Sequence, residues 1–256
     1  MTESDVVLVE VADDVATLTL NRPDRMNAIT VELGARLHVS LIEAAARAKA
    51  IVIRGSGGNF CAGGDFHELE RLREEGRDAM APLFANFRAA CDAIAELPVP
   101  VICAVEGYAT AGGFELAQAA DIVLVHENAV LADIHSRYGQ VPGGGSTQRL
   151  PRLVGRQRAL AHILTGDRLT ADDAVSWGLA YRKYRATEFD AEVQSFARQL
   201  AAKDPAALAK SKQLVNRGSG IPLAEGLSLE FETVLDHLAG RSAANGIGSF
   251  TKGSSR

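Results

Sequence analysis

One order of elements occurs twice in this sequence, first in Ile51-Val-Ile-Arg-Gly-Ser-Gly-Gly-Asn-Phe-Cys-Ala-Gly-Gly-Asp65 and again in Val101-Ile-Cys-Ala-Val-Glu-Gly-Tyr-Ala-Thr-Ala-Gly-Gly-Phe-Glu115. Each stretch begins with a short apolar run, which is typical of a strand buried on both faces. A glycine-rich turn and the start of a helix follow. Because the first turn of a helix leaves backbone N–H groups without partners, two such turns side by side could hold one oxyanion between two donors. The alternative is that the glycines serve only tight packing.

The segments around these stretches alternate between strand and helix patterns. Residues 6–11 and 15–20 predict a hairpin, and residues 31 to about 48 predict a helix with Thr30 as its N-cap. A short helix is expected over 112–120, followed by a strand over 122–125. Strands that alternate with helices in this way predict an α/β fold with a largely parallel sheet.

Helical patterns dominate after residue 150. Capping signals at Thr170, Thr187 and Asp204 each open a helical stretch, and only residues 181–184 have strand character. The final helix carries an apolar stripe that needs something to cover it. The stripe consists of Leu223, Leu227, Phe231, Val234 and Leu238.

The composition indicates an ordinary globular protein. The 256 residues are 47% hydrophobic and 23% charged, with a net charge of −5, which excludes a disordered, collagen-like or coiled-coil chain. An acidic balance without a basic stripe argues against nucleic acid as a partner. No apolar run approaches the roughly 18 residues that span a bilayer, and the start lacks the features of a signal peptide. We therefore expect no membrane partner and a cytoplasmic location.

The sequence offers no metal site. Its three cysteines lack the spacing of a zinc ribbon and are expected to be reduced thiols. Dinucleotide-binding, P-loop, zinc-protease and serine-hydrolase motifs are each incomplete or missing.

Four motifs in order closely resemble the crotonase superfamily, the enoyl-CoA hydratase/isomerase relatives. They are Asn21-Arg-Pro-Asp-Arg-Met-Asn-Ala28, Phe60-Cys-Ala-Gly-Gly-Asp65, Gly112-Gly-Phe-Glu-Leu-Ala117 and Val141-Pro-Gly-Gly-Gly-Ser-Thr-Gln-Arg-Leu150. The resemblance implies a crotonase-like spiral of ββα units over residues 1–200, with the site for coenzyme A and the acyl group. It also implies a helical C-terminal region over residues 201–256 that forms a homotrimer or a dimer of trimers.

The resemblance also assigns site residues. The backbone N–H groups of Gly64 and Gly112 match the family's oxyanion donors, between which a thioester carbonyl would sit. The segments that hold coenzyme A in the family match Arg25, Met26 and Ala28, together with Ala62, Gly63, Gly64 and Asp65. No cofactor is implied to stay bound, because coenzyme A arrives as part of the substrate.

Two side chains are the candidate acid and base. Glu115 matches the family's first catalytic carboxylate, and the helix dipole should favour its ionised form, which could hold a water or take a proton. The alternative is a glutamate that only complements the dipole. His135 stands where hydratases of the family normally have a second glutamate. An imidazole can still donate or accept a proton near neutral pH, although His135 could instead be structural.

Three functions follow from the resemblance. The first is an enzyme that stabilises an enolate and adds water to a 2-enoyl-CoA, with Glu115 as base and His135 as second acid/base. The second is an isomerase or a carbon–carbon hydrolase of β-diketones that uses His135. The third is a non-catalytic protein that binds acyl-CoA or a protein partner.

The neighbours of these two side chains have expected roles as well. Asp133 and Arg137 flank His135, and either could orient its ring. Tyr108 and Phe114 are expected to shape the acyl cavity.

Overall fold

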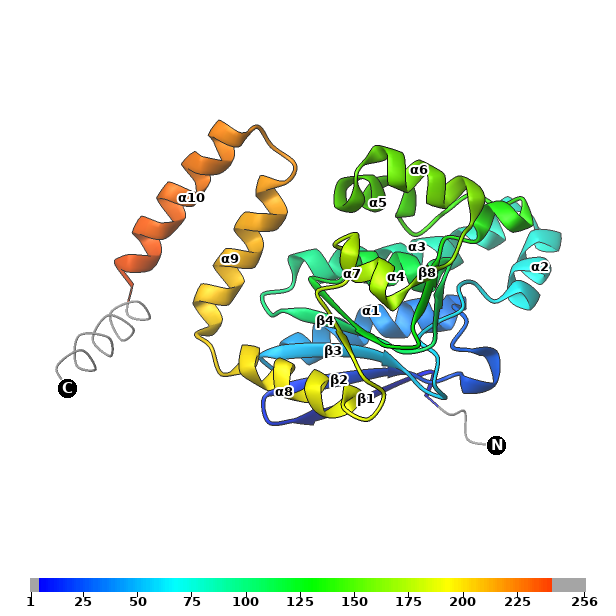
Figure 1. The fold of residues 1–256 in the computed structure, drawn as a ribbon, viewed down its shortest axis with the longest axis horizontal. Coiled ribbons are helices and arrows are strands. Elements are labelled where there is room, and N and C mark those ends of the chain that lie inside the picture. Colours follow the sequence, from blue (N-terminus) through cyan, green and yellow to red (C-terminus); the bar gives the residue numbers. More distant parts are fainter. Residues whose placement is uncertain (1–4, 241–256) are drawn as a thin grey trace.

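The computed structural model describes residues 5–240 of the chain (Figure 1). Its larger sheet has six strands in the order β1-β2-β3-β4-β6-β9, in which β1 and β2 are antiparallel and the other neighbours are parallel. These strands are β1 (Val7–Ala12), β2 (Val15–Leu20), β3 (Ala50–Gly55), β4 (Val101–Val105), β6 (Ile122–His126) and β9 (Arg182–Tyr184). The smaller sheet contains β5 (Tyr108–Thr110), β7 (Val130–Ala132) and β8 (Leu169–Thr170).

Helices cover both faces of the larger sheet. Ile51 and Ile53 of β3 belong to the core formed with α1 (Val31–Ala45) and α3 (Arg77–Glu96). Val52, between them, packs in a second core with α8 (Phe189–Ala201) on the opposite face (Figure 1). Since successive side chains of a strand point to opposite faces, a strand covered on both sides must be apolar throughout, as the sequence indicated.

The remaining helices surround the smaller sheet or follow the core. They are α2 (Phe66–Glu75), α4 (Gly112–Ala119), α5 (Ser146–Val154), α6 (Arg156–Thr165), α7 (Ala171–Ser176), α9 (Pro205–Gly218) and α10 (Leu223–Leu238), with the 3-10 helices η1 (Pro23–Arg25) and η2 (His135–Tyr138).

The expected α/β architecture of ββα units with a helical C-terminal region is confirmed, with three corrections of detail. The helix over 31–48 ends at Ala45, because the chain tightens into a turn in which the N–H of Arg47 bonds to the carbonyl of Ala44. Thr187 does not cap α8, whose N-cap is Glu188 without a side-chain hydrogen bond. None of the three strands of the smaller sheet, β5, β7 and β8, was expected from the sequence, since two or three residues are too few to set a pattern.

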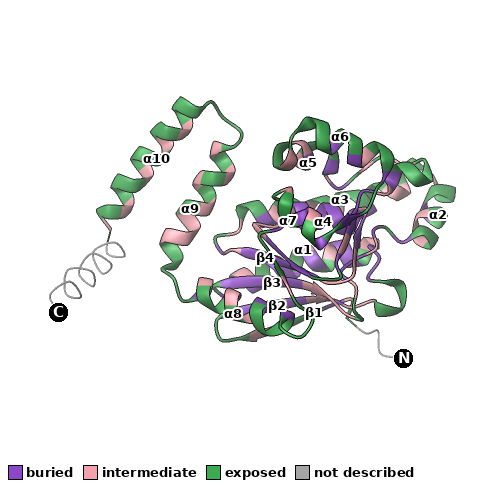
Figure 2. Ribbon diagram, viewed as in Figure 1, coloured by how far each residue is buried: buried purple, intermediate pink, exposed green. Residues whose placement is uncertain are grey.

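Of the last two described helices, α9 is tied to the body of the molecule by Lys212, which pairs with Asp121 at 2.6 Å, whereas α10 packs against α9 and extends away from the body (Figure 1). The apolar stripe of α10 is largely open to solvent in the single chain, with its five side chains 43–78% exposed (Figure 2). The expected boundary at residue 200 falls one residue before the end of α8, and residues 241–256 of the expected C-terminal region lie outside the described residues. The division into two regions and the trimer stay predictions. Within residues 5–240, no helix has the length and apolar character to cross a membrane.

The turn at 60–64 is held against β5 by backbone hydrogen bonds. The N–H of Cys61 donates to the carbonyl of Tyr108 at 2.9 Å, and the N–H of Thr110 donates back to Cys61 at 3.0 Å. Gly113, in the first turn of α4, lies so close to the carbonyl of Cys61 that an added Cβ would overlap it. The two glycine-rich turns predicted to lie side by side therefore do so.

This contact predicts a difference between two identical substitutions in helices. Gly113→Ala is expected to lower the free energy of unfolding by about 1–3 kcal/mol or more, because the new methyl group must displace the backbone of Cys61. Gly226→Ala in the exposed α10 meets nothing closer than 3.9 Å and is expected to raise it by about 0.5–1 kcal/mol. Urea unfolding of both variants gives the comparison. Equal changes in the two variants would show that the turn and the helix are not in contact.

Candidate active site

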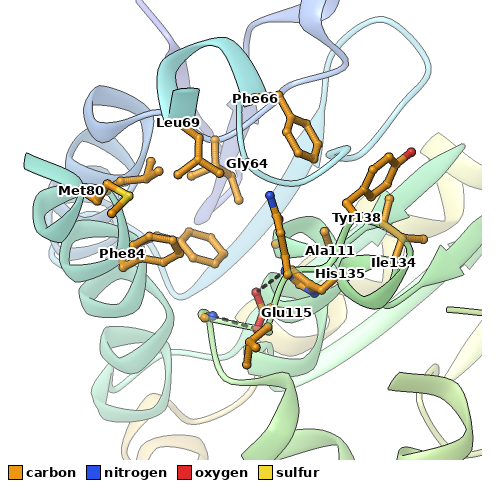
Figure 3. Close-up of a pocket in the computed structure, with 18 of the residues that line it drawn as sticks. Gly64, Phe66, Leu69, Met80, Phe84, Ala111, Glu115, Ile134, His135 and Tyr138 are labelled. Carbon is orange, nitrogen blue, oxygen red and sulfur yellow. Dashed lines mark hydrogen bonds and ion pairs between the residues drawn. The ribbon is translucent and has the colours of Figure 1, made fainter. Parts of the chain in front are cut away.

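A cavity of about 300 Å³ lies where α2, α3, α4 and η2 meet (Figure 3). Gly64, Gly112, Glu115 and His135 all contribute to its lining. The rest of the wall is mainly apolar and comes chiefly from Phe66, Leu69, Met80, Leu83, Phe84 and Phe87. The structure thus places all four candidate catalytic residues around one apolar space.

The two candidate oxyanion donors are backbone groups at the starts of two helices. Gly64 precedes Asp65, the N-cap of α2, and Gly112 is the first residue of α4. Neither N–H donates a hydrogen bond to any residue within 5–240. The two turns are also in contact, since a Cβ built on Gly63 would lie 3.3 Å from the nitrogen of Gly112. The two unpaired N–H groups therefore belong to adjoining turns that line the cavity, and their joint binding of one oxygen atom stays a prediction.

Ala111, immediately before Gly112, has a strained backbone. Its φ of 47° and ψ of −118° lie in a region that residues with a side chain rarely adopt. Such a conformation costs about 1–3 kcal/mol and persists only where the surroundings impose it. Nothing in the sequence indicated this feature, because an alanine gives no sign of positive φ.

Glu115 is held by the turn that precedes α5. Its Oε1 accepts hydrogen bonds from the N–H of Gly144 at 2.8 Å and of Ser146 at 3.0 Å. The side chain is 2% exposed, and this burial raises the pKa of Glu115 although the two N–H donors and His135 oppose the shift. The helix start was expected to favour the ionised form of Glu115, whereas burial shifts the pKa in the opposite direction. Because both hydrogen bonds go to Oε1, Oε2 is the carboxylate oxygen that is available to react.

His135 faces Glu115 and is oriented by Asp133. The Nε2 atom lies 3.9 Å from Oε2 of Glu115 (Figure 3), and Nδ1 lies 2.6 Å from Oδ1 of Asp133. An ionised Asp133 accepts the Nδ1 hydrogen, so Nε2 is the ring nitrogen available to the cavity. Burial alone would lower the pKa of His135, but the hydrogen bond and charge of Asp133, aided by Glu115, raise it.

Asp133 is itself fixed from both sides. Burial would raise its pKa, but the hydrogen bond from His135 holds the pKa below its usual range. Its backbone N–H donates to Nε2 of the buried His162 at 3.1 Å, a contact that the sequence did not suggest. Arg137, the other flanking candidate, is exposed and lies against Gly166. The question left open by chain order is answered in favour of Asp133.

A second hollow adjoins the cavity and contains most of the candidate coenzyme A residues. Its lining includes Arg25, Ala28, Ala62, Gly64 and Asp65. The two hollows share Ala62, Gly64, Phe66, Ile134 and Tyr138. Met26 and Gly63 do not line either space, and their carbonyls instead accept backbone hydrogen bonds from Ala62 and Ile29.

The expectation that Tyr108 and Phe114 shape the acyl cavity is wrong. Phe114 is 1% exposed and packs edge-on against His162, while the ring of Tyr108 lies beneath the guanidinium of Arg168. The apolar wall comes from α2 and α3. Sequence reasoning missed it because the apolar stripe of α3 looks the same whether it faces a core or a cavity.

Comparisons with known proteins give the family. Residues 10–253 match the family model described as enoyl-CoA hydratase/isomerase. The chain is 33% identical over 255 residues to the 1,2-epoxyphenylacetyl-CoA isomerase of Escherichia coli, covering 96% of this chain and 95% of that protein. It is 33% identical over 240 residues to the mitochondrial enoyl-CoA hydratase of Pongo abelii, covering 93% of this chain and 81% of that protein.

A solved structure agrees. The crystal structure of an enoyl-CoA hydratase from Polaromonas sp. JS666 superposes with a TM-score of 0.93 at 32% identity, covering 96% of each chain. The fold, the motifs and these matches converge: this chain belongs to the enoyl-CoA hydratase/isomerase family of the crotonase superfamily.

Proposed function

We propose that this protein is an enoyl-CoA hydratase, which adds water in the syn sense to the double bond of a 2-enoyl-CoA. The observation that carries the proposal is the 3.9 Å separation of Oε2 of Glu115 from Nε2 of His135, in the cavity that Gly64 and Gly112 also line. A water molecule can bond to both atoms at about 2.8 Å, while they are too far apart to bond to each other.

The two glycine N–H groups activate the substrate. Coenzyme A would lie in the hollow beside Arg25 and Ala62, so that the thioester carbonyl reaches the cavity at Gly64. Hydrogen bonds from Gly64 and Gly112 would stabilise the negative charge that develops on the carbonyl oxygen. One such donor is worth about 2.7–4 kcal/mol of transition-state stabilisation.

Proton transfer would use both side chains. Oε2 of Glu115 accepts a proton from the bound water as its oxygen forms a bond to C3, and the π electrons move through C2 onto the carbonyl oxygen. The protonated His135 then donates the Nε2 proton to C2, and the electrons return from the enolate to form the new C–H bond. The product is a 3-hydroxyacyl-CoA. Because both groups lie on the same side of the cavity, the two additions occur on one face.

The same pair could instead shift a double bond. If one of the two groups removed a proton from C2 of a 3-enoyl-CoA, the electrons would move onto the carbonyl oxygen as a dienolate, and protonation of C4 by the other group would give the 2-enoyl-CoA, which is an isomerisation. The 33% identity to a protein named as a 1,2-epoxyphenylacetyl-CoA isomerase favours testing this candidate. Carbon–carbon cleavage of β-diketones and binding without turnover are the other outcomes that assays must distinguish.

Glu115→Gln is expected to lower kcat for crotonyl-CoA hydration by about 10²–10⁴-fold, since the amide cannot accept the proton from water. Binding of butyryl-CoA, which cannot be hydrated, should change little. Loss of absorbance of the conjugated thioester measures the rate, and calorimetry measures binding. Glu106→Gln, the same substitution outside the cavity, is the control.

Three results would overturn the assignment. Undiminished hydration in Glu115→Gln would remove Glu115 from the reaction. Conversion of 3-enoyl-CoA without hydration would assign an isomerase, and binding without turnover of enoyl, 3-enoyl or β-diketo substrates would assign a non-catalytic protein.

The pH dependence of kcat/KM is expected to be bell-shaped. Glu115 must be ionised, so its raised pKa moves the acid limb to higher pH than for an ordinary glutamate. His135 must be protonated, so its raised pKa moves the alkaline limb to higher pH than for an ordinary histidine. Initial rates with crotonyl-CoA across the titration range of both groups test this. A kcat/KM that shows no fall at alkaline pH would contradict a protonated His135.

Asp133→Asn is expected to lower the pKa of His135, because the amide removes the negative charge that favours the imidazolium. The alkaline limb of kcat/KM should move to lower pH with it. NMR titration of the His135 ring measures the pKa directly, and Arg137→Gln is the control that should leave it unchanged. An unaltered pKa in Asp133→Asn would mean that Asp133 serves only the fold.

A further inference from the structure

One end of the cavity carries a cation. Phe66, Leu69 and Arg73 of α2 all line it, at positions i, i+3 and i+7, which lie on one face of a helix. Phe66 stands two residues after Gly64. Arg73 lies about two turns further along the helix, roughly 10 Å from Phe66 along its axis. The cation is therefore at the end away from the thioester position.

Arg73 has no ionic partner within residues 5–240. Its neighbour Arg71 behaves differently, since it pairs with Glu75 at 2.6 Å and lies 3.8 Å from Glu68. A further hollow, the outer hollow, adjoins this end of the cavity and is lined by Phe66, Leu69, Glu70, Arg73 and Gln140. Glu70 does not pair with Arg73 and does not line the cavity itself. The charge of Arg73 is thus available to a ligand.

The side chain of Gln140 lies beside Arg73 and also lacks a bonding partner in the described part of the chain. Gln140, on the loop after η2, lines both the cavity and the outer hollow together with Arg73. The side-chain amide of Gln140 makes no hydrogen bond in the part of the chain that the structure describes. The end of the cavity therefore offers a guanidinium and an amide, while the middle offers Leu69, Met80 and Phe84.

We propose that the acyl group bound by this protein carries a carboxylate at the end away from the thioester, and that Arg73 binds this carboxylate with Gln140 beside it. The proposal rests on the proposed function, in which the thioester carbonyl lies at Gly64 and Gly112. Guanidinium groups match carboxylates in a planar, two-point geometry, and an apolar wall beside them lowers competition from water. A plain alkyl chain would gain nothing from either polar group.

The test measures equilibrium binding of saturated thioesters, which cannot be hydrated. Calorimetry compares hexanoyl-CoA with adipoyl-CoA, and octanoyl-CoA with suberoyl-CoA, so that each pair differs only in the terminal carboxylate. Wild-type protein is expected to bind the carboxylate member of at least one pair roughly threefold to tenfold more tightly, as for a partly solvated charge-assisted bond. Arg73→Gln should abolish this preference and leave alkyl binding unchanged.

Arg71→Gln is the matched control and should keep the preference, because Arg71 is on the same helix but outside the cavity. Equal affinities within both pairs in the wild type would overturn the proposal. So would an equal loss of affinity for both members in Arg73→Gln, which would place Arg73 on the phosphates of coenzyme A. If the carboxylate preference is found but no enoyl-CoA is hydrated, only the proposed reaction fails.

Discussion

The structure depends on the backbone contact between the turn at 60–64 and the strand β5. Hydrogen bonds between Cys61 and both Tyr108 and Thr110 fix the turn to the strand, and the hydroxyl of Thr110 adds a bond to the carbonyl of Ala62 at 2.9 Å. A third partner, Ile29, bonds to both Gly63 and Asp65. These bonds use the neighbouring polar groups, while the N–H groups of Gly64 and Gly112, two residues that line the same cavity, donate no hydrogen bond within residues 5–240. Because the proposed oxyanion donors are backbone groups, their positions depend on the hydrogen bonds that fix both turns.

The buried ionisable side chains of this site interact electrostatically with one another. Asp133, His135 and Glu115 are all buried, with the imidazole between the two carboxyl groups. In the proposed reaction, Glu115 becomes neutral when it takes a proton from water, just as negative charge appears on the carbonyl oxygen between the glycines. Proton donation from His135 then removes that charge. The number of buried charges therefore does not rise during the reaction, which suits a cavity with little water.

Local patterns in the sequence predicted the strands of the larger sheet and the two turns, and motifs that resemble the family gave the candidates Glu115 and His135, because each depends on a few consecutive residues. Features that depend on contacts between residues far apart in the sequence could not be predicted from such local patterns. Asp133 and Arg137 are equally close to His135 along the chain, and only the folded structure shows that Asp133 is buried against Nδ1 of His135 while Arg137 is exposed. Tyr108 and Phe114 were expected to shape the acyl cavity, whereas its apolar wall comes chiefly from α2 and α3. Which face of a helix meets a cavity is decided by packing, not by periodicity.

The central claim is that the N–H groups of Gly64 and Gly112 bind one thioester oxygen. A crystal structure of the complex with acetoacetyl-CoA tests it most directly. The account predicts the thioester oxygen within about 3.1 Å of both nitrogens, with the acyl carbons beside Glu115 and His135. A thioester oxygen that contacts neither nitrogen, with the acyl group outside the cavity, would contradict it.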